Sequence, residues 1–336
     1  MKKIRIVTIG GFGHIDAVFR DLAVSDEVEL AGMAAAYEGE DISKFLNLPP
    51  AAGKKIQYDN YKQMLKELKP DAAVISTRLD LIPGLIMEAA EAGCHIIAEK
   101  PLALDMATLE KVQKCVEKNK VNLMAMLTMR SDPQFVIAKK IYDSGAIGDV
   151  IIANARKSYK WGTRPEWFGE KDKYGGTIGW VGIHAFDFIN YVTGQDFKKV
   201  AAMKSNIAHS DRKCCEDNCV IIAELSNGAH ATMSVDYCRP EAAPTHGDDW
   251  IRVVGTKGVL EASLAKKNCI VINNEKGTCE HILPNGKDQM FRRFLLNILN
   301  GKTEENEKLK QLSFMLTKVC LQTHKAAEQN TFIAID

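Results

Sequence analysis

The sequence predicts an α/β protein of two domains, in which a helix-covered parallel sheet is followed by an α+β domain on an open, mostly antiparallel sheet. Three observations lead to this prediction. The 336 residues exceed what one ordinary core of roughly 100 to 150 residues needs. Short β-branched runs alternate with helical stretches in the first third, whereas strand follows strand beyond Gly148. We expect a first domain over 1–127 and a second over 128–336, whose last helix packs back on the first.

The elements of the first domain follow from β-branched runs and helix-end signals. Helices are expected at Asn60–Lys69, Asp80–Gly93 and Asp105–Asn119, with Asp80 and Asp105 as N-caps. Asp132 with Pro133 then begins a helix that we expect to bridge the domains. The predicted strands are Ile4–Ile9, Val28–Ala34, Ala72–Thr77, His95–Glu99 and Val121–Leu127.

The second domain is predicted mainly from strands. Asn227-Gly228 lies between two apolar runs and is the strongest short-range hairpin signal in the chain. Helices are expected at Ile183–Thr193 and near Asp288–Asn300 and Glu304–Gln329. The predicted strands are Val150–Tyr159, Val200–Ile207, Val220–Leu225, Ala229–Tyr237, Trp250–Val254 and Cys269–Ile272.

Composition argues against several classes of function. With 46% hydrophobic and 26% charged residues, the chain is typical of a globular protein. Lys plus Arg number 44 and Asp plus Glu 43, so no net field favours nucleic acid or an anionic membrane. No apolar window approaches the roughly 18 residues that span a bilayer. Nine irregularly spaced cysteines fit a reducing compartment, so we expect a cytoplasmic protein with free thiols.

The first strand runs into a glycine-rich turn that precedes a helical stretch. In this context Gly10–Gly13 would let the backbone approach a pyrophosphate at the helix N-terminus, as in a dinucleotide-binding Rossmann domain. The match to GxGxxG is incomplete, because Phe12 or Asp16 stands at a glycine position, depending on the frame. A tight turn without a ligand is the alternative. No carboxylate follows the second strand before Glu38, so NAD and NADP both stay open.

The predicted strand His95–Glu99 leads directly into Glu99-Lys100-Pro101. Open α/β sheets bind ligands at the carboxyl ends of their strands. Oxidation of an alcohol by hydride transfer also requires a base near the nicotinamide, and a desolvated lysine beside a cation has its pKa pushed toward neutrality. A solvated lysine without a catalytic role is the alternative.

These residues resemble the EKP motif of the glucose-fructose oxidoreductase, inositol dehydrogenase and rhizopine catabolism (GFO/IDH/MocA) family. Further segments fall in the family's order over nearly the whole chain: the glycine loop, 129–133, 144–148, 175–187 and 253–258. The resemblance implies a Rossmann domain, a substrate-binding α+β domain with the substrate between the two, and a dimer or tetramer formed through the second sheet. It also implies catalysis and cofactor contact by Lys100, and a cis bond before Pro101.

The sequence departs from the family's motifs at two places. The family's DxxxH motif stands here as Trp180 to His184, so the histidine is kept and its aspartate is replaced. We expect His184 to act as acid/base or substrate ligand, with Asp187 as its orienting partner. A core histidine is the alternative. The loop that usually reads TPN is here Thr77-Arg78-Leu79, and Arg78 would either grip a phosphate or obstruct the dinucleotide.

Two turn-rich stretches, 159–165 and 236–249, could line a polyol or sugar site or be merely solvated. The predicted catalytic residues are Lys100, His184 and Asp187. The predicted cofactor-binding residues are Gly10, Gly11, Phe12, Gly13, His14, Thr77, Arg78, Glu99 and Lys100. The predicted substrate-binding residues are Tyr159, Trp161, Arg164, Trp180 and His246.

The pattern of His209 with Cys214, Cys215 and Cys219 raises the question of zinc, but its spacing fits no standard site, and we expect no metal. We therefore expect an NAD- or NADP-dependent oxidoreductase of a sugar, inositol or related polyhydroxy compound, without nucleic-acid or membrane partners. The alternatives are a glycosidase that redox-cycles its NAD and a catalytically silent nucleotide or sugar sensor on the same fold.

Overall fold

The computed structural model describes residues 3–211 and 215–335 and divides into two compact units. The first unit comprises the chain up to Thr128 together with Gln289–Thr317. The second comprises Met129–Asp288 and the chain from Lys318 onward.

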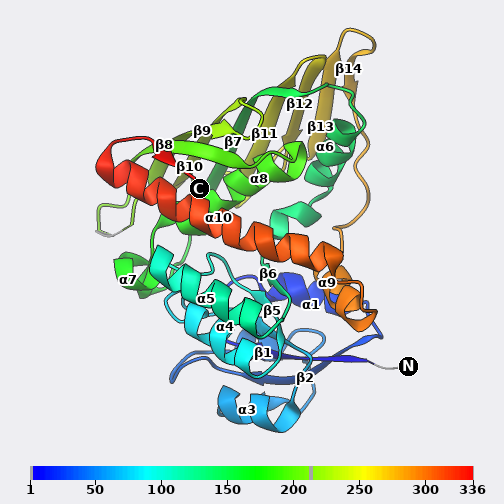
Figure 1. Cartoon of the computed structure of the whole chain (residues 1–336), viewed down its shortest axis with the longest axis vertical. Coiled ribbons are helices and arrows are strands. Elements are labelled where there is room, and N and C mark those ends of the chain that lie inside the picture. Colours follow the sequence, from blue (N-terminus) through cyan, green and yellow to red (C-terminus); the bar gives the residue numbers. More distant parts are fainter. Residues whose placement is uncertain (1–2, 212–214, 336) are drawn as a thin grey trace. The chain divides into compact units, whose positions relative to one another are not determined.

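A six-stranded parallel sheet forms the centre of the first unit, in the order β3-β2-β1-β4-β5-β6 (Figure 1). All five strands predicted for this domain are present, and the sequence prediction missed only the short β3. This strand order reverses between β1 and β4, which is where open α/β sheets bind ligands. The strands are β1 Ile4–Ile9, β2 Val28–Ala34, β3 Gln57–Tyr58, β4 Ala72–Ile75, β5 His95–Ala98 and β6 Leu123–Ala125.

The helix ends of the first unit follow from local chemistry, with one exception. Asn60 caps α3 by accepting from two backbone amides, and Asp105 caps α5 by accepting from Thr108. The N-cap predicted at Asp80 is wrong: α4 begins after Leu81, and the Asp80 carboxylate binds Arg78 instead. The helices are α1 Ile15–Leu22, α2 Ser43–Leu46, α3 Tyr61–Leu68, α4 Ile82–Glu91, α5 Met106–Lys118 and α9 Met290–Leu299.

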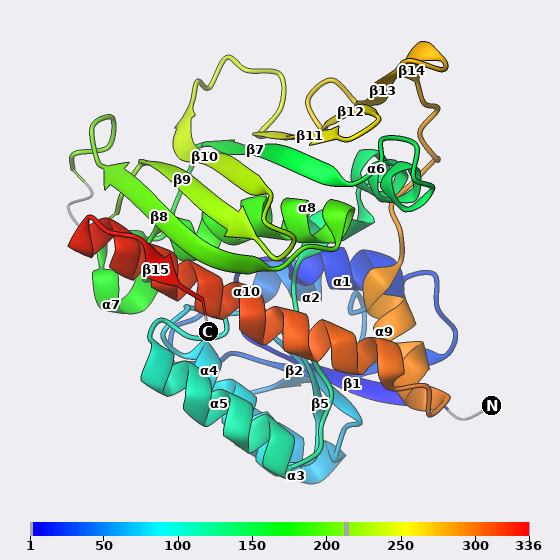
Figure 2. The same cartoon turned by 45° about the horizontal axis from the view of Figure 1, so that its top comes forward.

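A C-terminal segment completes the core of the first unit. Met290, Phe291 and Phe294 of α9 are buried in one cluster with side chains of α1, β1 and β2. The buried Asp21 carboxylate of α1 accepts a hydrogen bond from the Phe291 amide. Figure 2 shows α1 and α9 on one face of this sheet and α3 and α5 on the other. The long helix α10, Glu304–Gln329, contributes its residues up to Thr317 to this unit and the rest to the second.

A nine-stranded mixed sheet forms the second unit, in the order β14-β13-β12-β11-β7-β10-β9-β8-β15. Its described pairs are antiparallel except β7 with β10. The predicted hairpin is confirmed, since Asn227-Gly228 joins β9 to β10 and Gly228 has φ +85°. The strands are β7 Val150–Lys160, β8 Phe197–Ser205, β9 Asn218–Leu225, β10 His230–Arg239, β11 Gly247–Gly255, β12 Gly258–Ser263, β13 Asn268–Asn273, β14 Gly277–Glu280 and β15 Ile333–Ala334.

Helices cover one face of this sheet. Helix α6, Pro133–Asp143, packs on α8, Ile183–Thr193, where Phe135 and Phe188 stack at 4.4 Å. The expectation that α6 bridges the domains is wrong, because it lies wholly within the second unit. A short helix α7, Lys171–Tyr174, and a π-helical turn, Ile178–Gly182, lead into α8. The other face exposes apolar side chains of the strands, among them Ile152, Met203, Val220 and Ile222.

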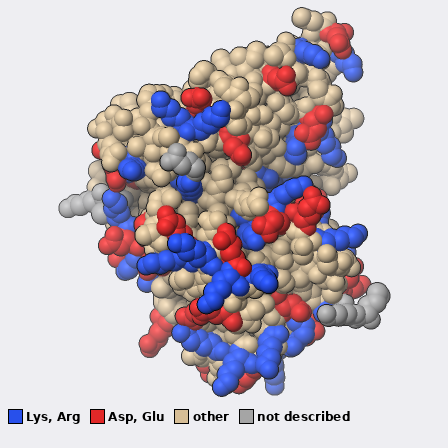
Figure 3. All heavy atoms as spheres, viewed as in Figure 1, with Lys and Arg blue, Asp and Glu red and all other residues tan. Residues whose placement is uncertain are grey.

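Basic and acidic side chains are interspersed on the surface drawn in Figure 3. This distribution agrees with the near balance of 44 basic and 43 acidic residues. Within the described ranges, no helix is both long and apolar enough to cross a membrane.

Candidate active site

A buried carboxylate fastens the glycine loop of the first unit. Glu99, at the end of β5, is fully buried, and its Oε2 accepts from the His14 amide and contacts His14 Nδ1, both at 2.8 Å. Its Oε1 accepts from the Lys100 amide and lies 3.9 Å from Lys100 Nζ. Burial acts to raise the pKa of Glu99, but the His14 and Lys100 charges and these hydrogen bonds outweigh it and lower the pKa to about 2. Glu99 is therefore ionised at neutral pH.

The glycines of the loop are required by its close packing. Gly13 has φ +82°, and a Cβ there would lie 2.1 Å from Glu99 Oε2. Gly10 has φ +103°, and its Cβ would lie 2.3 Å from the Ser76 carbonyl oxygen at the end of β4. Ser76 also donates a hydrogen bond to the Phe12 carbonyl. The loop is thus tied to the ends of two neighbouring strands, with α1 beginning directly after it.

Glu40 is a cofactor-site candidate that the sequence reasoning missed. Its Oε1 accepts from the Gly11 amide at 3.0 Å and from the Thr77 hydroxyl at 2.5 Å, and its Oε2 accepts from the Ala36 amide at 2.7 Å. A carboxylate of the chain thus binds the amide groups where β1 and β2 end. These donors fit an anionic or hydroxyl-rich ligand, which is what the pyrophosphate and ribose of a dinucleotide would offer.

A pocket of about 480 Å³ opens beside Glu40 at the carboxyl ends of β2 and β3. It is lined by residues 35–40, Ile42 and 57–61, which include three carboxylates and no lysine or arginine. Arg78 lies next to this region, over the Tyr37 ring at 5.0 Å, and binds Asp80 at 2.7 and 3.0 Å. The Arg78 charge is therefore already balanced by a carboxylate of the chain.

Lys100 stands at the carboxyl end of β5 with 1% of its side chain exposed. The Lys100–Pro101 peptide bond is cis, as the family resemblance implied. The side chains of Lys100, Glu99 and His14 thus lie together beside the glycine loop. The structure brings together the predicted cofactor residues of the loop with Glu99 and Lys100.

In the second unit, His184 and Asp187 are both fully buried on α8. Asp187 Oδ1 accepts from Arg130 Nε at 2.7 Å, and Arg130 also donates to Asn190 and lies over the Tyr191 ring. Burial raises the pKa of Asp187, with the Arg130 charge opposing it. Asp187 therefore orients Arg130, and its expected role beside His184 stays a prediction.

A second buried ion pair lies under α8. Lys157 Nζ of β7 is 2.6 Å from Asp249 Oδ2 of β11, and both side chains are almost fully buried. Burial lowers the pKa of Lys157 and raises that of Asp249, while each partner opposes the shift of the other. Lys157 also lies over the Tyr159 ring at 4.5 Å. Sequence reasoning assigned no role to this pair, since only the sheet register brings the two residues together.

Four of the five predicted substrate residues gather around Tyr237, at the end of β10. Tyr237 lies 5.1 Å from the Trp161 ring, 6.2 Å from the Tyr159 ring and 5.0 Å from the Arg164 guanidinium. The His246 ring contacts the Tyr159 ring in a tilted arrangement, with the ring centres 4.8 Å apart. We call this group the aromatic cluster; its members are Tyr159, Trp161, Arg164, Tyr237 and His246, together with His209, which stacks on Trp161 at 4.5 Å.

Trp180 joins this cluster indirectly. Its ring meets the edge of Phe168 at 6.0 Å, and Arg164 lies over the same Phe168 at 5.6 Å. Trp180 is 5% exposed and precedes His184 by about one helical turn. The residue that replaces the family's aspartate is therefore an apolar packing group that extends the cluster toward α8.

Three of the four residues that raised the question of zinc lie among the described residues. His209 Nε2 lies 2.9 Å from the Tyr237 carbonyl oxygen, and Cys215 and Cys219 are buried free thiols. Cys214 lies outside the described residues. Among residues 3–211 and 215–335, no group of three or more His, Cys, Asp or Glu side chains could hold a metal ion.

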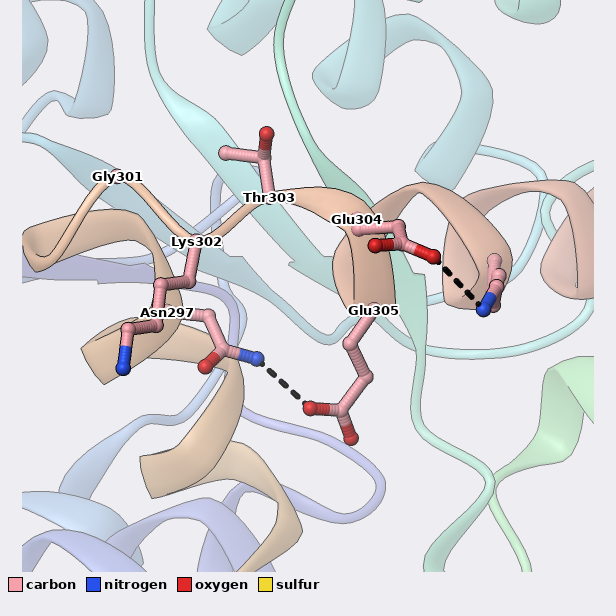
Figure 4. Close-up of a pocket in the computed structure, with 7 residues that line it drawn as sticks. Asn297, Gly301, Lys302, Thr303, Glu304 and Glu305 are labelled. Carbon is pink, nitrogen blue, oxygen red and sulfur yellow. Dashed lines mark hydrogen bonds and ion pairs between the residues drawn. The ribbon is translucent and has the colours of Figure 1, made fainter.

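One further pocket lies at the turn between α9 and α10 (Figure 4). Its polar groups bind one another: Asn297 donates to Glu305 at 3.0 Å and Lys308 donates to Glu304 at 3.1 Å. It shares no residue with the predicted sites.

Comparison with known proteins agrees with both halves of this architecture. Residues 4–127 match the model described as the oxidoreductase family, NAD-binding Rossmann fold. Residues 135–261 match the model of the GFO/IDH/MocA C-terminal domain. The chain belongs to the GFO/IDH/MocA oxidoreductase family.

Individual members of the family show how far the similarity extends. A solved structure from Thermotoga maritima, assigned as an oxidoreductase, is 34% identical, with a TM-score of 0.88 over 99% of this chain and 100% of that one. The myo-inositol 2-dehydrogenase of Thermotoga maritima is 23% identical over 82% of this chain and 79% of its own length. An inositol dehydrogenase homologue from Azotobacter vinelandii, solved with NADH and myo-inositol, shares the fold at 15% identity, with a TM-score of 0.81 over 99% of this chain and 98% of that one.

Family membership fixes the general activity. The chain is an NAD-binding oxidoreductase, a dehydrogenase that acts on CH–OH groups. The sequence predictions of family, fold class and enzyme class are confirmed.

Proposed function

We propose that this enzyme oxidises a secondary alcohol of a sugar, an inositol or a related polyhydroxy compound. The aromatic cluster of the second unit carries this proposal. Aromatic faces offer apolar surface to the C–H side of a sugar ring, and the polar groups among them can bind hydroxyls. Tyr159, Trp161 and His246 supply the faces, and the Arg164 guanidinium, which lies over the neighbouring Tyr237 ring, supplies polar N–H groups. The myo-inositol 2-dehydrogenase relative supports the same substrate class.

The cofactor in this proposal is NAD rather than NADP. The 2'-phosphate of NADP needs a cation, and the pocket at the ends of β2 and β3 is lined by Glu38, Glu40 and Asp59 with no lysine or arginine. Glu40 can instead accept hydrogen bonds from the ribose hydroxyls. Arg78, the nearby cation, is bound to Asp80. The amides of Gly11 and Ala36, now bound to Glu40, would be available to the dinucleotide when that side chain turns toward the ribose.

The residues then take the following roles. A bound NAD would supply the acceptor for the hydride that leaves the substrate carbon. The amine of Lys100 takes the hydroxyl proton of that carbon as the carbonyl forms. Glu99 is ionised, accepts from the backbone amides of Lys100 and His14, and lies 3.9 Å from the Lys100 amine, so it holds the amine and the loop in position. His184 binds a substrate hydroxyl, since a neutral imidazole can donate or accept one hydrogen bond. In this proposal residues 1–127 hold the dinucleotide and 128–336 hold the substrate.

The proposal is tested by following NADH formation with myo-inositol, scyllo-inositol and a panel of aldoses and alditols. We expect at least one of these compounds to reduce NAD, and the Lys100→Met variant to lose that activity. If the wild-type protein binds NAD but reduces none with any member, the substrate class is wrong. If a glycoside is instead hydrolysed without net NADH, the enzyme is a redox-cycling glycosidase.

A further inference from the structure

Arg164 presents a guanidinium group with few partners at the edge of the aromatic cluster. It lies over the rings of Tyr237 at 5.0 Å and Phe168 at 5.6 Å. Of its five N–H donors, the structure gives one a hydrogen bond, from Nη2 to the Lys160 carbonyl at 3.4 Å. Its Nε is buried and has no acceptor among the described residues. The Arg164 side chain is thus partly buried, and most of its N–H donors form no hydrogen bond within the described residues.

The other described arginines of the second unit are in a different situation. Each is paired with a carboxylate: Arg130 with Asp187, Arg156 and Arg239 with Asp248, and Arg252 with Glu261. Arg164 has no carboxylate within ion-pair distance in residues 3–211 and 215–335. A partly desolvated cation without an anion is costly, and such a site is stabilised by a ligand that brings the missing charge.

The surroundings add positive potential. Lys160 donates to the Glu241 backbone carbonyl at 2.6 Å and forms no ion pair within the described part of the chain. The pKa of the His246 imidazole is lowered by burial first and then by the charges of Arg164, Lys157 and Lys160, whereas Glu241 acts in the opposite direction. An anion bound here would meet the charges of Arg164 and Lys160 and the faces of the aromatic cluster.

We propose that the substrate is a polyhydroxy carboxylate, such as a uronate or an aldonate, whose carboxylate binds the guanidinium of Arg164. This inference rests on the proposed function, because it places the hydroxyl-bearing part of the same molecule on the aromatic cluster. A planar guanidinium fork matches the two oxygens of a carboxylate, and such charge-assisted pairs are shorter and stronger than neutral hydrogen bonds. The carboxylate orients the substrate and is not itself changed when the alcohol is oxidised.

The test compares acids with neutral partners of the same skeleton. Calorimetric titrations of the NADH-loaded protein would use D-glucuronate against D-glucose, D-galacturonate against D-galactose, and D-gluconate against D-glucitol. We expect at least one acid to bind about tenfold or more tightly than its neutral partner, and Arg164→Gln to abolish that difference. Arg164→Lys should restore part of it. Arg252→Gln, which also removes one arginine of this unit, is the matched control and should leave it unchanged.

The outcomes separate this inference from the proposed function. If no acid binds more tightly than its neutral partner, or if Arg164→Gln keeps the preference with an unchanged melting temperature, the inference is wrong. The same holds if D-glucose 6-phosphate shows the larger Arg164-dependent gain, since the site is then one for phosphate. If neutral polyols reduce NAD without any preference for acids, the proposed function stands and this inference fails. Arg164-dependent binding of an acid, with no NADH formed from it, supports the inference and contradicts the proposed oxidation.

Discussion

Lys100 and Glu99 form a buried ion pair beside the glycine loop of the first unit. Both side chains are buried at the end of β5, and Glu99 bonds to the loop residue His14 as well as to Lys100. The position of Lys100 after a parallel strand was readable from the sequence. The role of Glu99 in holding the glycine loop was not, because it depends on how the loop returns to the ends of β4 and β5.

The Lys100→Met variant should lose about 100-fold or more in kcat, because it removes the group that takes the hydroxyl proton while keeping the length of the side chain. Steady-state NADH formation measures this loss. The same substitution at the exposed Lys111 is the control and should leave kcat unchanged. Full activity of Lys100→Met with its substrate would contradict the assignment.

The Glu99→Gln variant should lower the free energy of unfolding by about 3 kcal/mol at neutral pH, because it leaves buried positive charge without its anion. The pKa of Glu99 is lowered from the ordinary 4.5 to about 2 in the folded state. Its contribution is therefore complete above the unfolded-state pKa and is lost as the pH falls from 4.5 toward 2. Chemical unfolding at a series of pH values measures this; a difference between wild type and variant that grows on acidification would refute it.

The other residues of the two candidate sites differ in whether the sequence alone could predict them. Tyr159, Trp161, Arg164 and His246 were predicted as substrate residues from turn-rich stretches, and the structure gathers them in one cluster. Their centre, Tyr237, lies in the 236–249 stretch that could line a sugar site, but it was not among the predicted substrate residues, because only the fold brings the other rings to it. Glu40 was missed because it lies six residues beyond β2 and reaches Gly11 only through a folded-back loop.

At the scale of elements, local sequence patterns were sufficient to predict a helix or strand where the segment itself determines its structure. Helices α8 and α10 have the predicted bounds, because apolar periodicity and a stop at Gly194 or a polar end define them. Strand β12, Gly258–Ser263, was missed because glycine and glutamate interrupt its pattern and its pairing with β11 and β13 is what makes it a strand. The N-cap at Asp80 failed because Arg78 competes for the same carboxylate.

The Lys157–Asp249 pair joins β7 to β11 beneath α8 and permits a test at this scale. Lys157→Met alone should cost roughly 3 to 5 kcal/mol of unfolding free energy, because it leaves Asp249 buried and unpaired. The double variant Lys157→Met with Asp249→Leu should recover most of this loss. Denaturant unfolding of both variants, with the exposed Lys198→Met of β8 as control, gives the comparison. A double variant no more stable than Lys157→Met would show that the charge pair is not the cause.

At the scale of the whole molecule, the face of the second sheet opposite its helices exposes apolar side chains that could form an interface. Met203 and Val220 pair across β8 and β9, and Ile222 follows on the same face; their exposed fractions are 79%, 58% and 42%. A contiguous apolar surface of this kind is typical of protein interfaces. The sequence prediction of a homodimer or homotetramer stays a prediction, and this face is where we expect it to form.

The Val220→Lys variant should therefore reduce the oligomer size, because it places a charge in the middle of that face. Light scattering after size exclusion measures the mass of wild type and variant. Val24→Lys changes an equally exposed valine of the first unit and should leave the mass unchanged. A monomeric wild-type protein, or an unaltered mass for Val220→Lys, would exclude this face as the interface.

A calorimetric titration with NAD and NADP tests directly the dinucleotide site proposed at the glycine loop and Glu40. We expect the wild-type protein to bind one NAD per chain and to bind NADP at least about tenfold more weakly, because Glu38, Glu40 and Asp59 repel a 2'-phosphate. Glu40→Gln should narrow that difference, while Glu29→Gln on β2 should not. Absence of NAD binding, or tighter binding of NADP, would contradict the proposed site.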